Sequence, residues 1–208
     1  MIKLPKALRA TLSEAKVEQI EIERKFRLKV QNSQLETKKA VTCSKGCSHC
    51  CHYPVHISLL EGIQLYSWLR GQGLWTRSLR EKFQEVSTKT WNLPLEVWFL
   101  SMIPCPLLKD NLCTAYAGRP LVCRLTKSMG DPYYCHPHRM GESTDFIDRR
   151  QEMNEHTRSH MTKLKTHQQR SGLLPLATAV LYGEKVCNGE LEISEVDQAL
   201  LEEHREKG

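Results

Sequence analysis

The stretch Cys43-Ser-Lys-Gly-Cys47-Ser-His-Cys50-Cys51 contains four cysteines with the spacing C-x3-C-x2-C-C. After a long interval without any, four more follow at Cys105, Cys113, Cys123 and Cys135. Thiolates are charged, soft ligands, so several in one short loop are favourable only when a metal ion, an iron–sulfur cluster or disulfide bonds neutralise them. Because Cys50 and Cys51 are adjacent, they project in different directions, and one is expected to reach beyond its own loop. The pattern predicts a cysteine-ligated metal centre.

Disulfide bonds are the competing interpretation, and they are typical of small secreted domains. The N-terminal segment MIKLPKALRATLSEAK has charges every few residues and no continuous apolar region, unlike an export signal. No apolar run approaches the ~20 residues that are needed to cross a bilayer. With 208 residues and 40% hydrophobic content, the chain can bury a core without covalent links. We therefore expect reduced thiols, a cytoplasmic protein and no association with a membrane.

The charge of the chain indicates only a weak attraction to acidic partners. The formal net charge is +6 at pH 7, and residues 1–42 contribute most of it. Metal-bound thiolates would add negative charges that this count omits. The sequence has no basic stripe with interleaved aromatic residues and no recognition motif. A nucleic-acid partner is therefore weakly signalled, and a protein partner is the other expectation.

Residues 12–39 have a pattern that fits either a helix or a strand. Val17, Ile20, Leu28 and Leu35 would share one face of a helix over this segment. Part of the segment also alternates between apolar and charged residues, as a strand would. Its length and its Glu, Lys, Arg and Gln content favour the helix.

Most of the remaining chain outside the cysteine-rich loops is also predicted to be helical. A capping box, Ser58-Leu-Leu-Glu61, opens a helix that is expected to end at Gly71. The stretch 105–135 is expected to be an ordered loop with one short helix over 115–123. Further helices are expected over 75–94, 144–170, 175–182 and 194–206. The expected fold is mainly α with irregular cysteine-rich loops, a small single domain centred on a metal. Its expected divisions are a charged helical extension (1–42), a cysteine-cluster core (43–140) and C-terminal helices packed on that core (141–208).

The two cysteine groups together resemble the YkgJ-type cysteine-cluster family, whose relatives include flagellin lysine N-methylases. That family follows its C-x3-C-x2-C-C opening with a C-P block and a Y-x-x-R-P-x-x-C-R block. Here these are Cys105-Pro-Leu-Leu and Tyr116-Ala-Gly-Arg119-Pro-Leu-Val-Cys123-Arg124. The resemblance covers residues 40–140 and implies chelation of zinc or iron. The expected metal ligands are Cys43, Cys47, Cys50, Cys51, Cys105, Cys113, Cys123 and Cys135.

Three residues of the last block are expected to surround the ligands. Arg119 and Arg124 are placed to offset thiolate charge or to donate hydrogen bonds to sulfur, and Tyr116 lies beside them in the sequence. The alternative for the two arginines is an ordinary salt bridge with an acidic residue. Pro106 and Pro120 fix φ and remove backbone donors, which helps to shape the loops that present the thiols.

The spacing of the cysteines leaves the metal open between iron and zinc. Structural zinc sites are usually built from two C-x2-C-like pairs, and only Cys47-Ser-His-Cys50 has that spacing. A C-x3-C-x2-C loop suits three corners of a [4Fe–4S] cluster, so Cys43, Cys47 and Cys50 are expected to hold one centre. Cys51 is expected to face the downstream cysteines, which should also supply a fourth ligand to that centre. An iron–sulfur cluster is favoured, although eight cysteines would equally suit two zinc ions.

Histidines are the remaining ligand candidates. His49, His52 and His56 flank the first cysteine group, and His136 and His138 follow the second. At least one of them is expected to take part in the centre.

Two other features stand apart from the cysteine groups. His156 and His160 lie four residues apart on an expected helix and could chelate a metal. Because the segment lacks the glutamate of a metalloprotease motif, a solvated face is the expectation. Cys187 is isolated in the sequence, and we expect a buried or free thiol.

Three functions follow from these observations. The first is a metal-binding protein whose centre shapes a surface for a partner protein. The second is an iron–sulfur-dependent enzyme, with S-adenosylmethionine as a candidate co-substrate, that modifies a protein lysine as the methylase relatives would imply. The third is a zinc-stabilised module that binds nucleic acid or protein. No catalytic triad, acid pair or phosphate-binding glycine loop is present, so any reaction would have to depend on the metal centre.

Overall fold

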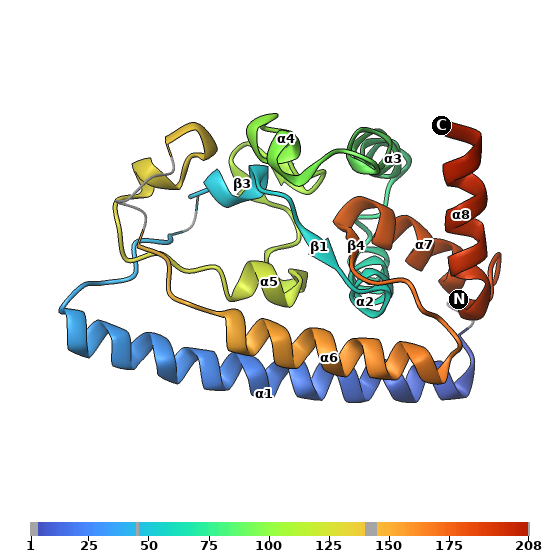
Figure 1. The fold of residues 1–208 in the computed structure, drawn as a ribbon, viewed down its shortest axis with the longest axis horizontal. Coiled ribbons are helices and arrows are strands. Elements are labelled where there is room, and N and C mark those ends of the chain that lie inside the picture. Colours follow the sequence, from blue (N-terminus) through green and yellow to red (C-terminus); the bar gives the residue numbers. More distant parts are fainter. Residues whose placement is uncertain (1–3, 45, 140–144, 208) are drawn as a thin grey trace.

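The computed structural model describes residues 4–44, 46–139 and 145–207 (Figure 1). Within these residues the fold is mainly α and forms one small domain, as predicted. The helices are α1 (Lys6–Thr37), α2 (Leu59–Gly71), α3 (Arg77–Thr90), α4 (Leu95–Leu100), α5 (Leu121–Arg124), α6 (Arg150–Thr166), α7 (Leu176–Asn188) and α8 (Val196–Lys207). The strands are β1 (His56–Ile57), β2 (Leu108–Lys109), β3 (Leu112–Cys113) and β4 (Leu174–Pro175). Some of the expected boundaries lie outside the described residues. They are the first and last residues of the chain, the division between 140 and 141, and the start of the helix expected over 144–170.

The longest helix, α1, lies side by side with α6 along one edge of the molecule (Figure 1). The helix that we predicted over 12–39 is confirmed, but its buried face differs from the predicted apolar stripe. Buried positions on α1 are Leu8, Ala15, Gln19, Ile22 and Phe26. The predicted stripe is exposed instead: Val17, Ile20, Leu28 and Leu35. The reason is that α1 carries apolar residues on more than one face, and only the face toward α2, α5 and α6 is covered.

The capping box at the start of α2 is present as predicted. The hydroxyl of Ser58 accepts a hydrogen bond from the backbone N–H of Glu61 (3.2 Å). In return, Glu61 Oε2 accepts one from the N–H of Ser58 (3.4 Å). The helix ends at Gly71, also as predicted.

The centre of the fold is the contact between α2 and α7, which α3 also joins. The two backbones come so close that glycine is required on both sides. A Cβ atom on Gly62 would lie 2.2 Å from the carbonyl oxygen of Ala179. One on Gly183 would lie 2.8 Å from the carbonyl carbon of Gly62. This contact joins a helix of the cysteine-containing half to a C-terminal helix in one hydrophobic core.

Short strands connect the cysteine-rich loops to this core. β1 pairs with β4, so that His56 lies opposite Pro175 at the start of α7. β2 and β3 form a tight hairpin whose turn residues, Asp110 and Asn111, have φ of 50° and 58°. Such left-handed residues suit the twist of a two-residue hairpin. The hairpin holds Cys113 at a defined place in a region where the sequence predicted only a loop.

None of the helices in the described ranges combines the length and the apolar character that a membrane crossing requires.

Candidate metal centre

The two cysteine groups meet beside the start of α7. The backbone N–H of Cys105 donates to the carbonyl oxygen of Cys51 (2.8 Å), which ties the downstream block to the first loop. A cavity of about 510 Å³ is lined by residues of both groups and by Leu176. Its cysteines are Cys47, Cys50, Cys51, Cys105, Cys113 and Cys123. All nine cysteines of the chain lie in described residues, and each is a free thiol.

Cys43 and Cys135 approach each other through Ser128. The N–H of Ser128 donates to Cys43 Sγ (3.3 Å), and the Ser128 side chain hydrogen-bonds Cys135. Burial raises the pKa of the Cys135 thiol, and the nearby thiols of Cys43, Cys47 and Cys50 raise it further. These four cysteines are therefore electrostatic neighbours, although they are far apart in the sequence.

Cys51 is directed toward the downstream cysteines. Its thiol hydrogen-bonds Cys50, which raises the pKa of Cys51 and lowers that of Cys50 to about 7. Burial raises the pKa of Cys51 further, and so do Cys105 and Cys113. Cys123 is a neighbour of the same two cysteines, and burial raises its pKa strongly. A second set of neighbouring thiols is thus Cys51, Cys105, Cys113 and Cys123, with Cys50 at the boundary between the sets.

The pKa shifts indicate how the thiols would respond to a metal. Burial raises the pKa of Cys105 to about 12, so that this thiol is protonated at neutral pH. Metals bind the thiolate form, and their binding displaces such protons. The arrangement of sulfur donors around one cavity fits a thiolate-ligated metal or cluster.

Two arginines lie close to the thiols. Arg119 lines the cavity, and its charge lowers the pKa of Cys50 after the larger contribution of the hydrogen bond from Cys51. Its guanidinium stacks 3.5 Å from the ring centroid of Tyr116, which also lines the cavity. Arg149 also lowers the pKa of Cys50, and burial lowers the pKa of Arg149 itself. Arg149 was not predicted from the sequence, because no cysteine motif contains it.

The third residue expected around the ligands, Arg124, has acidic and polar partners instead. Its guanidinium donates to Glu23 (2.6 Å) and to the side-chain oxygen of Gln19 (3.4 Å), both on α1. It is not among the residues that line the cysteine cavity. This geometry corresponds to the salt-bridge alternative, because the side chain extends from α5 toward α1.

Three of the five flanking histidines gather beside the cysteine loops. The ring centroids of His49 and His136 are 6.0 Å apart, and those of His136 and His138 are 5.7 Å apart. The Nδ1 atom of His52 is buried without a hydrogen-bond partner. His56 lies on β1, where burial lowers its pKa. Among the flanking histidines of the described residues, His52 is therefore the one with a buried nitrogen that lacks a hydrogen-bond partner.

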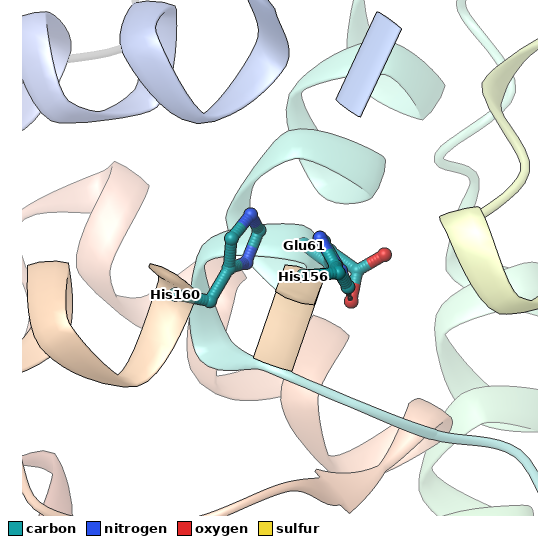
Figure 2. A group of neighbouring side chains, drawn as sticks. All are labelled: Glu61, His156 and His160. Carbon is teal, nitrogen blue, oxygen red and sulfur yellow. Dashed lines mark ion pairs between the residues drawn. The ribbon is translucent and has the colours of Figure 1, made fainter. Parts of the chain in front are cut away.

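His156 and His160 are buried, so the expectation of a solvated face was wrong. Both lie on the face of α6 that packs toward α2, where their side chains gather with that of Glu61 (Figure 2). His156 and His160 are 2% and 1% exposed, and Glu61 is 4% exposed. Burial lowers the pKa of His160 to about 4, which makes its ring neutral at physiological pH. The i, i+4 spacing was visible in the sequence, but the carboxylate beside it comes from another helix.

Cys187 lies apart from both cysteine sets. It is buried on α7, where its sulfur lies 3.6 Å from the hydroxyl of Ser67. This matches the prediction of a buried or free thiol.

Comparisons with known proteins place this arrangement in a family. No curated protein and no solved structure matches the chain. The model of the CxxCxxCC family, described as a putative zinc- or iron-chelating domain, matches residues 42–170. The match covers more than half of the chain and includes both cysteine sets, Arg119, Arg149 and the whole of α6. The chain therefore belongs to the CxxCxxCC family of zinc- or iron-chelating domains.

Proposed function

We propose that this chain is an iron–sulfur protein whose cysteines hold clusters rather than single zinc ions. The supporting observation is the separation of the sulfur atoms. Four thiolates at about 2.3 Å from one zinc ion, in a tetrahedron, would lie roughly 3.8 Å from each other. In the described part of the chain, no three cysteine sulfurs come within 4.8 Å of one another. In a cluster each cysteine binds a different iron, so its ligands surround a larger volume.

The two sets of neighbouring thiols suggest how the ligands divide. We assign Cys43, Cys47, Cys50 and Cys135 to one centre, since the thiols of the first three all raise the pKa of Cys135. The other four cysteines, Cys51, Cys105, Cys113 and Cys123, would hold a second centre. This division makes the adjacent cysteines Cys50 and Cys51, whose thiols hydrogen-bond each other, ligands of different centres.

Anaerobic purification followed by metal and sulfide analysis tests this proposal. The expected result is iron and acid-labile sulfide in equal amounts, with an absorption band near ~400 nm. Protein that is isolated without oxygen and contains zinc, but no sulfide, would overturn it. Because clusters of this kind require reduced thiols, alkylation of freshly lysed cells without reductant should also show no linked cysteine pairs.

A second candidate function is an enzyme that uses the cluster to modify a protein. The supporting observation is the cavity itself, because about 510 Å³ is in the range of small-molecule sites. Asn111, Tyr116 and Arg119 line it together with the cysteines and provide polar groups that could orient a ligand. The test is to add S-adenosylmethionine to the reduced protein and compare electron paramagnetic resonance spectra. A changed cluster signal would support the enzyme, and an unchanged one would favour a structural or electron-carrying centre.

A further inference from the structure

We propose that Glu61, His156 and His160 bind one divalent transition-metal ion, at a site separate from the cysteine centre. Two imidazole nitrogens and one carboxylate oxygen are a donor set suited to Zn²⁺ or Fe²⁺. The inference does not depend on which metal the cysteines hold.

The geometry of the three side chains is the first argument. One potential ligand atom from each lies within 4.8 Å of the other two. Among the described residues this is the group of histidines, cysteines and acids that meets that distance. The two histidines are four residues apart on α6, a spacing that directs both rings to the same face of a helix. Figure 2 shows their rings beside the carboxylate of Glu61, which comes from the first turn of α2.

The second argument is the presence of two unpartnered nitrogens in a buried place. The Nε2 atoms of His156 and His160 are both buried without a hydrogen-bond partner. Nε2 of His156 lies 3.0 Å from Glu61 Oε2, but without the alignment that a hydrogen bond requires. Buried polar atoms in proteins are nearly always hydrogen-bonded, so these two buried nitrogens need an explanation. A metal ion bound to all three would provide it.

The hydrogen bond of His160 supports the same interpretation. Its Nδ1 lies 2.6 Å from the hydroxyl oxygen of Ser58. When Nδ1 carries the proton and donates to that oxygen, Nε2 is left with a free lone pair. Histidines that bind metals typically donate their other ring N–H to an oxygen in this way, which fixes the tautomer and the ring orientation. The opposite tautomer would leave a buried N–H on Nε2 without an acceptor.

The carboxylate is also held in position by groups other than the histidines. Glu61 Oε1 accepts from the N–H of Leu121 (2.9 Å), and Oε2 accepts from the N–H of Ser58 (3.4 Å). A carboxylate has about four lone-pair directions, so two remain for other ligands. An ion pair between Glu61 and His156 would explain the short distance between these two side chains. It would leave Nε2 of His160 without a partner.

A second cavity adjoins the site at Glu61. Glu61 lines a cavity of about 540 Å³ between α1, α2 and the start of α5. Arg119 and Pro120 line both this cavity and the cysteine cavity. With three protein ligands and an adjacent cavity, the site has the composition of metal sites that keep a position open for water or a substrate.

Metal analysis of the full chain with matched variants tests the proposal. His156→Ala and His160→Ala should each lose about one metal equivalent per chain and keep the metal of the cysteine centre. His167→Ala is the control, because His167 follows the same helix but its Nε2 already bonds the hydroxyl of Thr11 (2.9 Å). The control should keep the full metal content. Full metal content in both histidine variants would overturn the proposal.

A measurement on the unchanged protein covers the case in which the variants do not fold. Co²⁺ is added as the probe to wild-type protein that retains its cysteine-bound metal, and the cobalt edge is measured by X-ray absorption. The expected first shell contains nitrogen and oxygen scatterers without sulfur. A first shell of sulfur scatterers would overturn the site. So would the absence of cobalt binding both with and without a prior chelator wash. Loss of the ~400 nm band alone would bear on the cysteine centre and not on this one.

Discussion

Replacing Gly62 by alanine tests the contact on which the fold depends. The added Cβ would lie 2.2 Å from the carbonyl oxygen of Ala179 and 2.5 Å from its carbonyl carbon. Ordinary contacts begin near 3.4 Å, so α2 and α7 would have to move apart by about 1 Å. The obstacle is backbone, which cannot rotate away as a side chain can.

The expected loss of stability can be worked from two opposing effects. Overpacking a close contact costs typically 1–3 kcal/mol, and a backbone obstacle places this case near ~3 kcal/mol. Alanine is a better helix former than glycine by about 1 kcal/mol, which offsets part of that cost. The free energy of unfolding should therefore fall by about 2 kcal/mol. For a chain of this size, that corresponds to a decrease in Tm of roughly 4–8 °C.

Chemical denaturation monitored by circular dichroism, at matched metal content, is the appropriate assay. Gly71→Ala is the control on the same helix, because a Cβ there would meet no atom within 4 Å. Gly183→Ala should also destabilise, since its Cβ would lie 2.8 Å from Gly62 backbone. The double variant should lose less than the sum, because one separation of the helices accommodates both side chains. If Gly62→Ala were as stable as Gly71→Ala, the close contact between the helices would be refuted.

Three further predictions concern the cysteine centre. Cys47→Ser should lose most of the metal, whereas Cys187→Ser should keep it because Cys187 is buried away from both sets; the reverse result in elemental analysis would contradict the ligand assignment. Removing the metal should increase hydrogen exchange in the cysteine-bearing loops, because metal binding supplies on the order of 10 kcal/mol where its ligands are. The helices α2, α3 and α7 should stay protected, because they share the hydrophobic core. Arg119→Gln should make the reduction potential of the centre more negative, because a nearby positive charge favours the reduced form. Arg124→Gln should change the potential little, because its side chain pairs with Glu23. Equal shifts of the two variants in protein-film voltammetry would show that distance to the thiols does not control the effect.

The sequence predicted those helices whose ends carry local signals. The capping box of Ser58 and Glu61 identified the start of α2, because its hydrogen bonds involve only neighbouring residues. The buried face of α1 was assigned wrongly because burial depends on partners that are distant in the sequence. Leu8, Ala15 and Ile22 are seven residues apart and pack inward, yet Ala15 carries almost no hydrophobic signal by itself.

The candidate site shows the same division between local and distant information. Cysteine spacing identified the thiols, since metal ligands that share a short loop leave their pattern in the sequence. It did not identify Arg149, which reaches the thiols only through the fold. Nor could it place Glu61 beside His156 and His160, since the carboxylate comes from α2 and the imidazoles come from α6. The capping box already explained a glutamate at position 61, so there was no reason in the sequence to expect Glu61 beside the two histidines as well.

The first turn of α2 connects the two proposed sites. Ser58 contacts His160, and Glu61 lies against His156. The same Glu61 carboxylate accepts from the N–H of Leu121, at the start of the short helix that carries Cys123. A shift of this turn would therefore move a ligand of the nitrogen–oxygen site and, through α5, a cysteine of the thiolate site. Gly62 follows directly and fixes how closely the turn can approach α7. The close helix contact thus bears on both proposed sets of metal ligands, which come from several separate segments of the chain.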